Sequence, residues 1–250
     1  MPKSSWREYL ADGRLVSAIR SSDRVAVLTG AGISAESGIP TFRGEAGLWK
    51  KFRPEELANF DAFMANPELV WEWYRFRRDI VRKSKPNAGH RALATWEQNV
   101  ESFTLITQNV DGLHERAGSA NMIELHGNLE RDRCLDCGRI DRSAEWSAAE
   151  LPQCSCGGRL RPDVVWFGEM LPEGAMDRAV EAAWSSDLFL TVGTSAVVQP
   201  AASLPFAAKR QGALLVEVNP EPTPVSEYAD FALYGMAGEV LPTLLGLRDE

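Results

Sequence analysis

A short apolar run that ends in two closely spaced glycines constrains the fold of this chain most. Residues 25–29 read Val-Ala-Val-Leu-Thr, and Gly30 and Gly32 follow at once. Glycine lets the backbone turn tightly and lets a phosphate approach the main chain at the start of a helix. The spacing differs from the G-x-G-x-x-G fingerprint, because the next glycine is Gly38. The stretch predicts either a phosphate-binding turn or a plain connection from a strand to a helix beginning near Ile33.

Further apolar runs alternate with helical patterns along the chain. We expect strands at residues 24–29, 103–107, 122–125, 188–192 and 213–218, an extended segment at 164–167, and helices at 54–84, 88–99, 174–184 and from Ala237 onward. Within 54–84, Asn66-Pro67 is a second start signal. Alternation of this kind predicts an α/β fold with a parallel sheet covered on both faces. Polar residues follow several of the strands, at the ends where ligands of open α/β sheets bind.

All four cysteines lie in one short segment. Cys134 and Cys137 have C-x-x-C spacing, and Cys154 and Cys156 have C-x-C spacing. Four thiolates form a closed tetrahedral site for Zn²⁺, whereas two disulfides are the alternative. We expect one structural zinc ion, since the start of the chain lacks the apolar run of a secretory signal.

Histidine is scarce, with three in the chain. His90 and His114 fall at helix starts, where packing or capping roles are expected. His126 follows a strand and precedes a glycine, so its imidazole would face the ligand crevice as a general base or else serve in packing.

The net charge and the lengths of the apolar runs limit the kinds of partner that we expect. A net charge of -8 argues against a protein that binds nucleic acid by neutralising phosphates. No apolar run is long enough to span a bilayer, so we expect a cytoplasmic protein that binds no membrane.

Taken together, the motifs resemble those of the sirtuin family. Matching segments lie at residues 30–34, 38–44, 107–114, 124–127, 161–169 and 193–195, together with the cysteine pairs, and the resemblance covers about residues 15–245. It implies an NAD-dependent deacylase that acts on acylated lysine side chains of proteins.

The resemblance also implies which residues bind NAD. The expected set is Gly30, Ala31, Gly32, Ser34, Phe42, Arg43, Gln108, Asn109, Asp111, Gly193, Thr194, Ser195, Asn219 and Ala237. The first four would line the diphosphate and ribose site, and Phe42 and Arg43 would lie on a closing loop. Gln108, Asn109 and Asp111 would position the ribose and the nicotinamide carboxamide, and the remaining residues would face the adenosine half.

For catalysis, the resemblance makes His126 the base. The acyl oxygen of the substrate would displace nicotinamide, and water would complete the release of lysine and O-acyl-ADP-ribose. Val165, Trp166, Phe167 and Gly168 would form the strand edge to which an extended peptide adds. Mono-ADP-ribosyl transfer to protein and a non-catalytic NAD or ADP-ribose sensor are the alternatives.

Two residues of one expected helix predict which acyl group the enzyme prefers. Tyr74 and Arg77 share a helix face, and their spacing resembles the Tyr-x-x-Arg of sirtuins that remove succinyl, malonyl or glutaryl groups. The alternative is a solvated basic face, because Arg75, Arg78 and Arg82 are nearby. Asp163 departs from the Arg-Pro-His-Val-Val of many relatives, which leaves a substrate contact open.

The expected architecture is therefore a Rossmann-like doubly wound parallel sheet with a smaller inserted zinc-ribbon and helical module. Residues 1–43, 87–128 and 161–250 would form the NAD-binding domain, 44–86 a cofactor loop and helical insert, and 129–160 the zinc ribbon.

Overall fold

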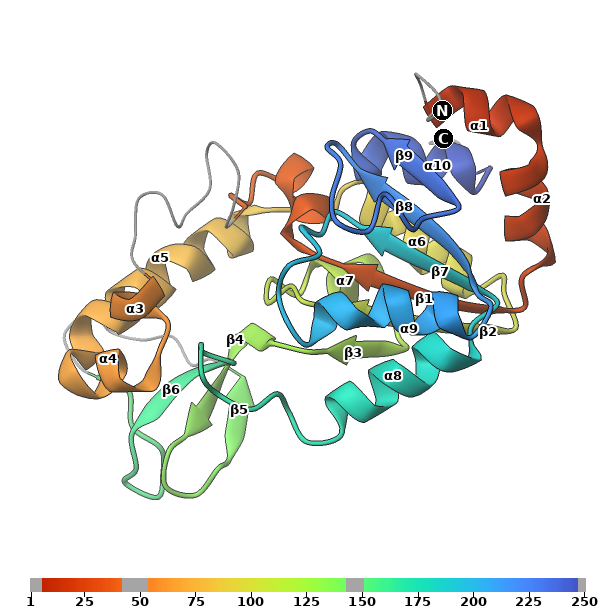
Figure 1. Cartoon of the computed structure of the whole chain (residues 1–250). Helices are drawn as coiled ribbons and strands as arrows, with labels where there is room; N and C mark the ends of the chain where they lie inside the picture. Colours follow the sequence, from red (N-terminus) through yellow and green to blue (C-terminus); the bar gives the residue numbers. More distant parts are fainter. Residues whose placement is uncertain (1–5, 42–53, 143–150, 247–250) are drawn as a thin grey trace.

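A six-stranded parallel sheet forms the centre of the molecule (Figure 1). The computed structural model describes residues 6–41, 54–142 and 151–246. The strand order is β3-β2-β1-β7-β8-β9, which is the 3-2-1-4-5-6 order of doubly wound dinucleotide-binding sheets. The strands are β3 (Met122–Glu124), β2 (Ser102–Thr107), β1 (Arg24–Thr29), β7 (Leu188–Val192), β8 (Leu214–Asn219) and β9 (Phe231–Tyr234). The predicted fold class is confirmed.

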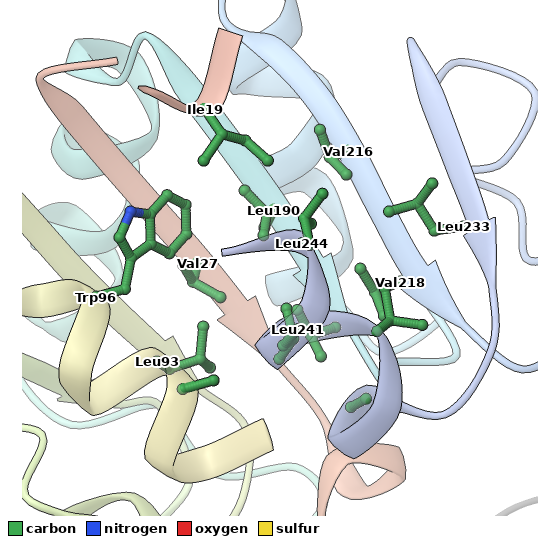
Figure 2. Close-up of a cluster of buried hydrophobic side chains, with 14 of the residues drawn as sticks. Ile19, Val27, Leu93, Trp96, Leu190, Val216, Val218, Leu233, Leu241 and Leu244 are labelled. Carbon is green, nitrogen blue, oxygen red and sulfur yellow. The ribbon is translucent and has the colours of Figure 1, made fainter. Parts of the chain in front are cut away.

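Helices cover both faces of this sheet because successive strand residues point to opposite sides. Val25 and Val27 of β1 contribute to a core with the first group of helices, as Figure 2 shows for part of it, whereas Ala26 and Leu28 face the second group. The first group is α1 (Trp6–Asp12), α2 (Arg14–Ser21), α6 (Ala88–Glu97) and α10 (Ala237–Leu244). The second group is α8 (Ala175–Ser185), η3 (Ala201–Ser203) and α9 (Leu204–Arg210).

A smaller unit joins a three-stranded sheet to three helices beside the large sheet (Figure 1). Its strands are β4 (Gly127–Cys134), β5 (Ile140–Arg142) and β6 (Leu160–Val164), in the antiparallel order β5-β4-β6. Its helices are α3 (Pro54–Leu57), α4 (Phe60–Ala65) and α5 (Pro67–Lys83). Their apolar faces and the small sheet share one core, which includes Phe63, Trp71 and Leu129.

A buried ion pair fixes α5 to β4. Arg78 Nη2 lies 2.5 Å from Asp132 Oδ1, and the two side chains are 2% and 1% exposed. The same guanidinium donates to the carbonyls of Leu129 and Arg131. Removal of either charged partner would leave an uncompensated buried charge, so the pair holds the helix to the strand.

The structure differs from the predicted elements in four places. The helical region expected over residues 54–84 is three helices: α5 begins at the expected second start at Asn66-Pro67, and the Asn59 side chain caps a further N-terminus at α4. The helix expected near Ile33 is the short 3-10 helix η1 (Ala31–Ser37). Strand β9 was not predicted. Segment 164–167, expected to be extended, is strand only at its first residue.

The predicted domain boundaries stay predictions, although β4 begins two residues before the expected start of the ribbon at residue 129. Helix α7 (Leu113–Ala117) follows β2. None of the described helices is both long and apolar enough to cross a membrane.

Candidate active site

A cavity of about 870 Å³ lies where the carboxyl ends of β1 and β7 meet the smaller unit. The chain reverses its strand order between β1 and β7, and this switch point is where open α/β sheets bind ligands. Of the predicted NAD-binding residues, nine line the cavity: Gly30, Ala31, Gly32, Gln108, Asn109, Gly193, Thr194, Ser195 and Asn219. The volume is in the range of pockets for cofactors and small ligands.

The glycine turn at the base of the cavity brings two strand ends into contact. The Gly32 N–H donates to the Gly193 carbonyl over 2.7 Å. A Cβ added at Gly32 would lie 2.6 Å from that oxygen, and one at Gly30 would lie 2.9 Å from it. The close contact with the Gly193 backbone therefore requires glycine at positions 30 and 32. This requirement holds whether or not a phosphate also approaches the turn.

Amide side chains connect the ends of β1, β2 and β7. Gln108 Nε2 donates to Thr194 Oγ1 over 3.0 Å, and Asn109 Nδ2 donates to the Gly30 carbonyl over 3.1 Å. These hydrogen bonds fix the orientation of both amides at the cavity wall.

Ser34 and Asp111 line a narrow adjoining cavity, which shares Ala31, Arg77 and Asn109 with the larger one. Asp111 accepts hydrogen bonds from Ser34 Oγ at 2.7 Å and from the Leu113 N–H at 2.9 Å. Burial raises the pKa of Asp111, while these hydrogen bonds partly oppose that shift. These two hydrogen bonds hold the buried carboxyl in place.

His126 lies between β3 and β4 and lines the large cavity. Its Nδ1 is 3.0 Å from the Gln108 carbonyl oxygen. A carbonyl oxygen only accepts, so Nδ1 carries the hydrogen and Nε2 keeps the basic lone pair. Burial lowers the pKa of His126, and the hydrogen bond to the carbonyl partly opposes this. The imidazole is therefore neutral at pH 7 and able to take a proton.

The other two histidines are buried structural groups, as expected. His90 completes a capping box with Asn87 at the start of α6, and its Nε2 lies 3.4 Å from Ser34 Oγ. His114 Nε2 lies 3.0 Å from Thr29 Oγ1, and the two imidazole rings are 4.7 Å apart. Burial lowers the pKa of His90 to about 4, and it lowers the pKa of His114 well below its ordinary value.

These two histidines are expected to make the fold sensitive to acid. The unfolded chain binds protons on both below about pH 6.5, whereas in the folded chain His90 does so only near pH 4 and the pKa of His114 lies well below its ordinary value, so stability falls as pH drops below about 6.5. At pH 5 the loss should be about 2 kcal/mol for His90, and His114 should add to it in the same direction. Urea unfolding at pH 7 and pH 5 measures it. His114→Gln, which leaves the cysteine cluster intact, should reduce the pH slope by about one proton; an unchanged slope would contradict this assignment.

The predicted substrate segment also lines the large cavity, with Val165, Trp166, Phe167 and Gly168 all at its wall. The segment is a turn, in which the Glu169 N–H donates to the Trp166 carbonyl over 3.0 Å. Gly168 has φ +85°, which glycine adopts without strain. Within the described residues, no hydrogen bond uses the Val165 carbonyl or the Gly168 N–H.

Tyr74 and Arg77 line the same cavity from α5. The Arg77 side chain is 8% exposed, and its guanidinium lies 5.7 Å from the centroid of the Tyr74 ring. Burial lowers the pKa of Arg77, and the charge of Asp111 partly opposes the shift. Arg78 and Arg82 instead contact β4, so the solvated basic face expected as the alternative does not include Arg77.

The four cysteine sulfurs form one cluster, with all Sγ atoms within 4.8 Å of one another. Cys134 and Cys156 Sγ are 3.5 Å apart, and Cys137 and Cys154 Sγ are 3.7 Å apart. Tetrahedral zinc with bonds of about 2.3 Å places its sulfurs about 3.8 Å apart, whereas a disulfide would need about 2.05 Å. The cluster therefore fits one structural zinc ion and excludes disulfides.

Asp163 forms two ion pairs that could not be predicted from the sequence. The side chain is 3% exposed and contacts Arg131 at 3.0 Å and Arg133 at 2.6 Å. Arg131 also binds Glu124 at 2.6 Å. This network crosses from β6 to β4, and its members are too far apart in sequence to form a local pattern.

Among the predicted cofactor residues that the structure describes, Ala237 lines neither cavity. Phe42 and Arg43 lie outside the described residues. Ala237 is buried in the core under the first turn of α10, against Gly89. A cofactor role for these residues stays a prediction.

The fold and the site define an α/β enzyme with a dinucleotide cavity at its switch point and a ribbon held by four cysteines. The chain belongs to the Sir2 family, whose model matches residues 30–200. It is therefore a sirtuin-type enzyme, as the motifs predicted.

Relatives and solved structures agree with this family. The chain is 56% identical over 208 residues to an NAD-dependent protein deacylase of Aquifex aeolicus (strain VF5), covering 82% of this chain and 87% of the relative. A Sir2 homologue in complex with NAD has a TM-score of 0.89 and 50% identity, covering 94% of this chain and 93% of that one. A Sir2 complex with p53 peptide and NAD⁺ has a TM-score of 0.81 and 33% identity, covering 97% and 98%.

Proposed function

We propose that the chain removes acyl groups from protein lysine side chains at the expense of NAD, acting on acetyl and on acidic acyl groups such as succinyl and malonyl. The observation that carries the proposal is the neutral imidazole of His126, with Nε2 unprotonated, on the wall of a cavity at the sheet's switch point. NAD and peptide complexes of relatives support the same use of this cavity.

When bound, NAD would supply a glycosidic bond that breaks to release nicotinamide as the acyl oxygen of the substrate bonds to the ribose carbon. His126 accepts a proton at Nε2 from a ribose hydroxyl, which makes that oxygen a nucleophile. Gln108 and Asn109, whose amides are held by Thr194 and Gly30, orient the ribose and the nicotinamide carboxamide.

The peptide site uses the turn after β6. The Val165 carbonyl and the Gly168 N–H are available to an extended peptide, since no other described group bonds them. This adjoining peptide segment favours lysine deacylation over a role as an NAD sensor. The four-cysteine cluster takes no part in the proposed reaction, because four protein ligands around one zinc ion leave no open position for a substrate.

The proposal is tested with one peptide that carries acetyl-, malonyl-, succinyl- or glutaryl-lysine, incubated with and without NAD and followed by mass spectrometry. Loss of the acyl mass only with NAD, together with O-acyl-ADP-ribose, is the expected result. ADP-ribosylated protein without deacylated peptide would favour ADP-ribosyl transfer instead, and no turnover at all would favour the sensor.

Arg77→Met is expected to lower the ratio of desuccinylation to deacetylation efficiency by about ten- to a hundredfold, since a charge-assisted bond to a carboxylate contributes about 1.5–3 kcal/mol. Steady-state kinetics on the two peptides measure this ratio. Arg82→Met is the matched control, because Arg82 lies on the same helix, lines neither cavity and pairs with Glu130 at the surface. An unchanged ratio in Arg77→Met would show that Arg77 does not bind the acyl group.

A further inference from the structure

Trp166 lines the cavity and is held by contacts to both its backbone and its ring. Its backbone N–H donates to Glu169 Oε2 over 2.8 Å. The Arg161 guanidinium carbon lies 3.4 Å from the centroid of its ring, and Arg161 in turn donates to Glu169 and to the Val164 carbonyl. The side chain is 2% exposed. These contacts fix the direction of the indole.

The indole N–H donates to the Tyr74 hydroxyl oxygen over 2.8 Å. Tyr74 is 1% exposed and lines the cavity. Among the residues that the structure describes, none accepts the hydrogen of the Tyr74 hydroxyl. Burial raises the pKa of Tyr74, and this exceeds the opposing effect of Arg77, so the phenol keeps its proton at neutral pH. The hydroxyl accepts from Trp166 and retains one hydrogen to donate.

We propose that Trp166 determines acyl specificity by fixing the Tyr74 hydroxyl as a hydrogen-bond donor toward the acyl group. The inference rests on the proposed deacylase function and adds a positioning residue to it. A terminal carboxylate only accepts hydrogen bonds, so it matches a phenol whose acceptor site is already occupied, with the Arg77 cation alongside. An acetyl group ends in a methyl and gains nothing from this polarity. Without the indole N–H, the hydroxyl is free to turn and accept instead of donate.

The test compares succinyl- and acetyl-lysine forms of one peptide. Trp166→Phe removes the N–H and keeps an aromatic ring, and the ratio of succinyl to acetyl kcat/KM should fall about three- to tenfold, the effect of one hydrogen bond. Tyr74→Phe should lower the ratio by a similar factor. In the Tyr74→Phe background, Trp166→Phe should cause no further fall in the ratio, because the bond through which it acts is already absent.

Controls separate this role from general damage. Trp184→Phe, an exposed tryptophan on α8 away from the cavity, should leave the ratio unchanged. Benzothienylalanine at position 166 keeps the indole shape with sulfur in place of N–H and should reproduce the loss even if phenylalanine loosens the packing. A normal ratio in both variants at position 166, or fully additive losses in the double variant, would overturn the role of Trp166. A wild-type chain without NAD-dependent turnover would instead overturn the proposed function.

Discussion

Replacement of His126 by alanine is expected to reduce NAD-dependent deacylation by about 10²- to 10⁴-fold, the usual contribution of a general base. Its Nδ1 is committed to the Gln108 carbonyl, which leaves Nε2 as the basic nitrogen facing the cavity. No other histidine can substitute, because His90 and His114 are fully buried in their own hydrogen-bonded network. Mass-spectrometric deacylation rates measure the loss.

The same variant should retain ADP-ribose binding and bound zinc, since His126 makes no contact with the cysteine cluster. Isothermal titration with ADP-ribose and metal analysis provide these controls. Wild-type turnover in His126→Ala would show that another group takes the proton.

Replacement of Cys154 by serine should release the metal and unfold the small sheet, because binding of a structural zinc supplies on the order of 10 kcal/mol to such modules. The sheet has little other support on its exposed side: the three residues of β5 are all exposed. Since β6 leads directly into the segment at residues 165–168, deacylation should be lost as well. Zinc content, the melting temperature and turnover are measured together.

Ser155→Ala is the matched control for this experiment. Ser155 lies between two of the cysteines, and its hydroxyl accepts a hydrogen bond from the exposed Arg139 side chain, so zinc content and melting temperature should stay near wild type. A Cys154→Ser protein that lacks zinc and yet melts at the wild-type temperature would contradict a structural role for the metal.

The parallel sheet was predictable because its strands carry a strong local signal. Each central strand is a short, mostly apolar run, such as Leu188–Val192, followed by a polar turn. Strand β9 escaped prediction because it has four residues, lies at the sheet edge and buries only alternate side chains. The helix expected near Ile33 is the seven-residue 3-10 helix η1, which ends at Gly38 in a left-handed conformation.

The site was predictable where its residues stand together in motifs at strand ends. Gln108, Asn109 and His126 line the cavity as expected, and the cysteine pairs form one cluster. Contacts between distant segments were not predictable from one sequence. The Trp166–Tyr74 hydrogen bond joins residues 92 positions apart, and the Gln108–Thr194 bond joins residues 86 apart. Such pairs arise from packing, which no local spacing encodes.

The anchoring of Arg78 has a consequence for its neighbour in sequence. Consecutive residues of an α-helix point about 100° apart around the axis. Arg78 is tied to the backbone and to Asp132 of β4, so the rotational phase of α5 is set by that strand. The direction of the Arg77 side chain therefore depends on β4, the strand that ends at the cysteine cluster with Cys134. The small sheet that carries the cysteine cluster thus helps to set the position of the Arg77 guanidinium at the cavity wall.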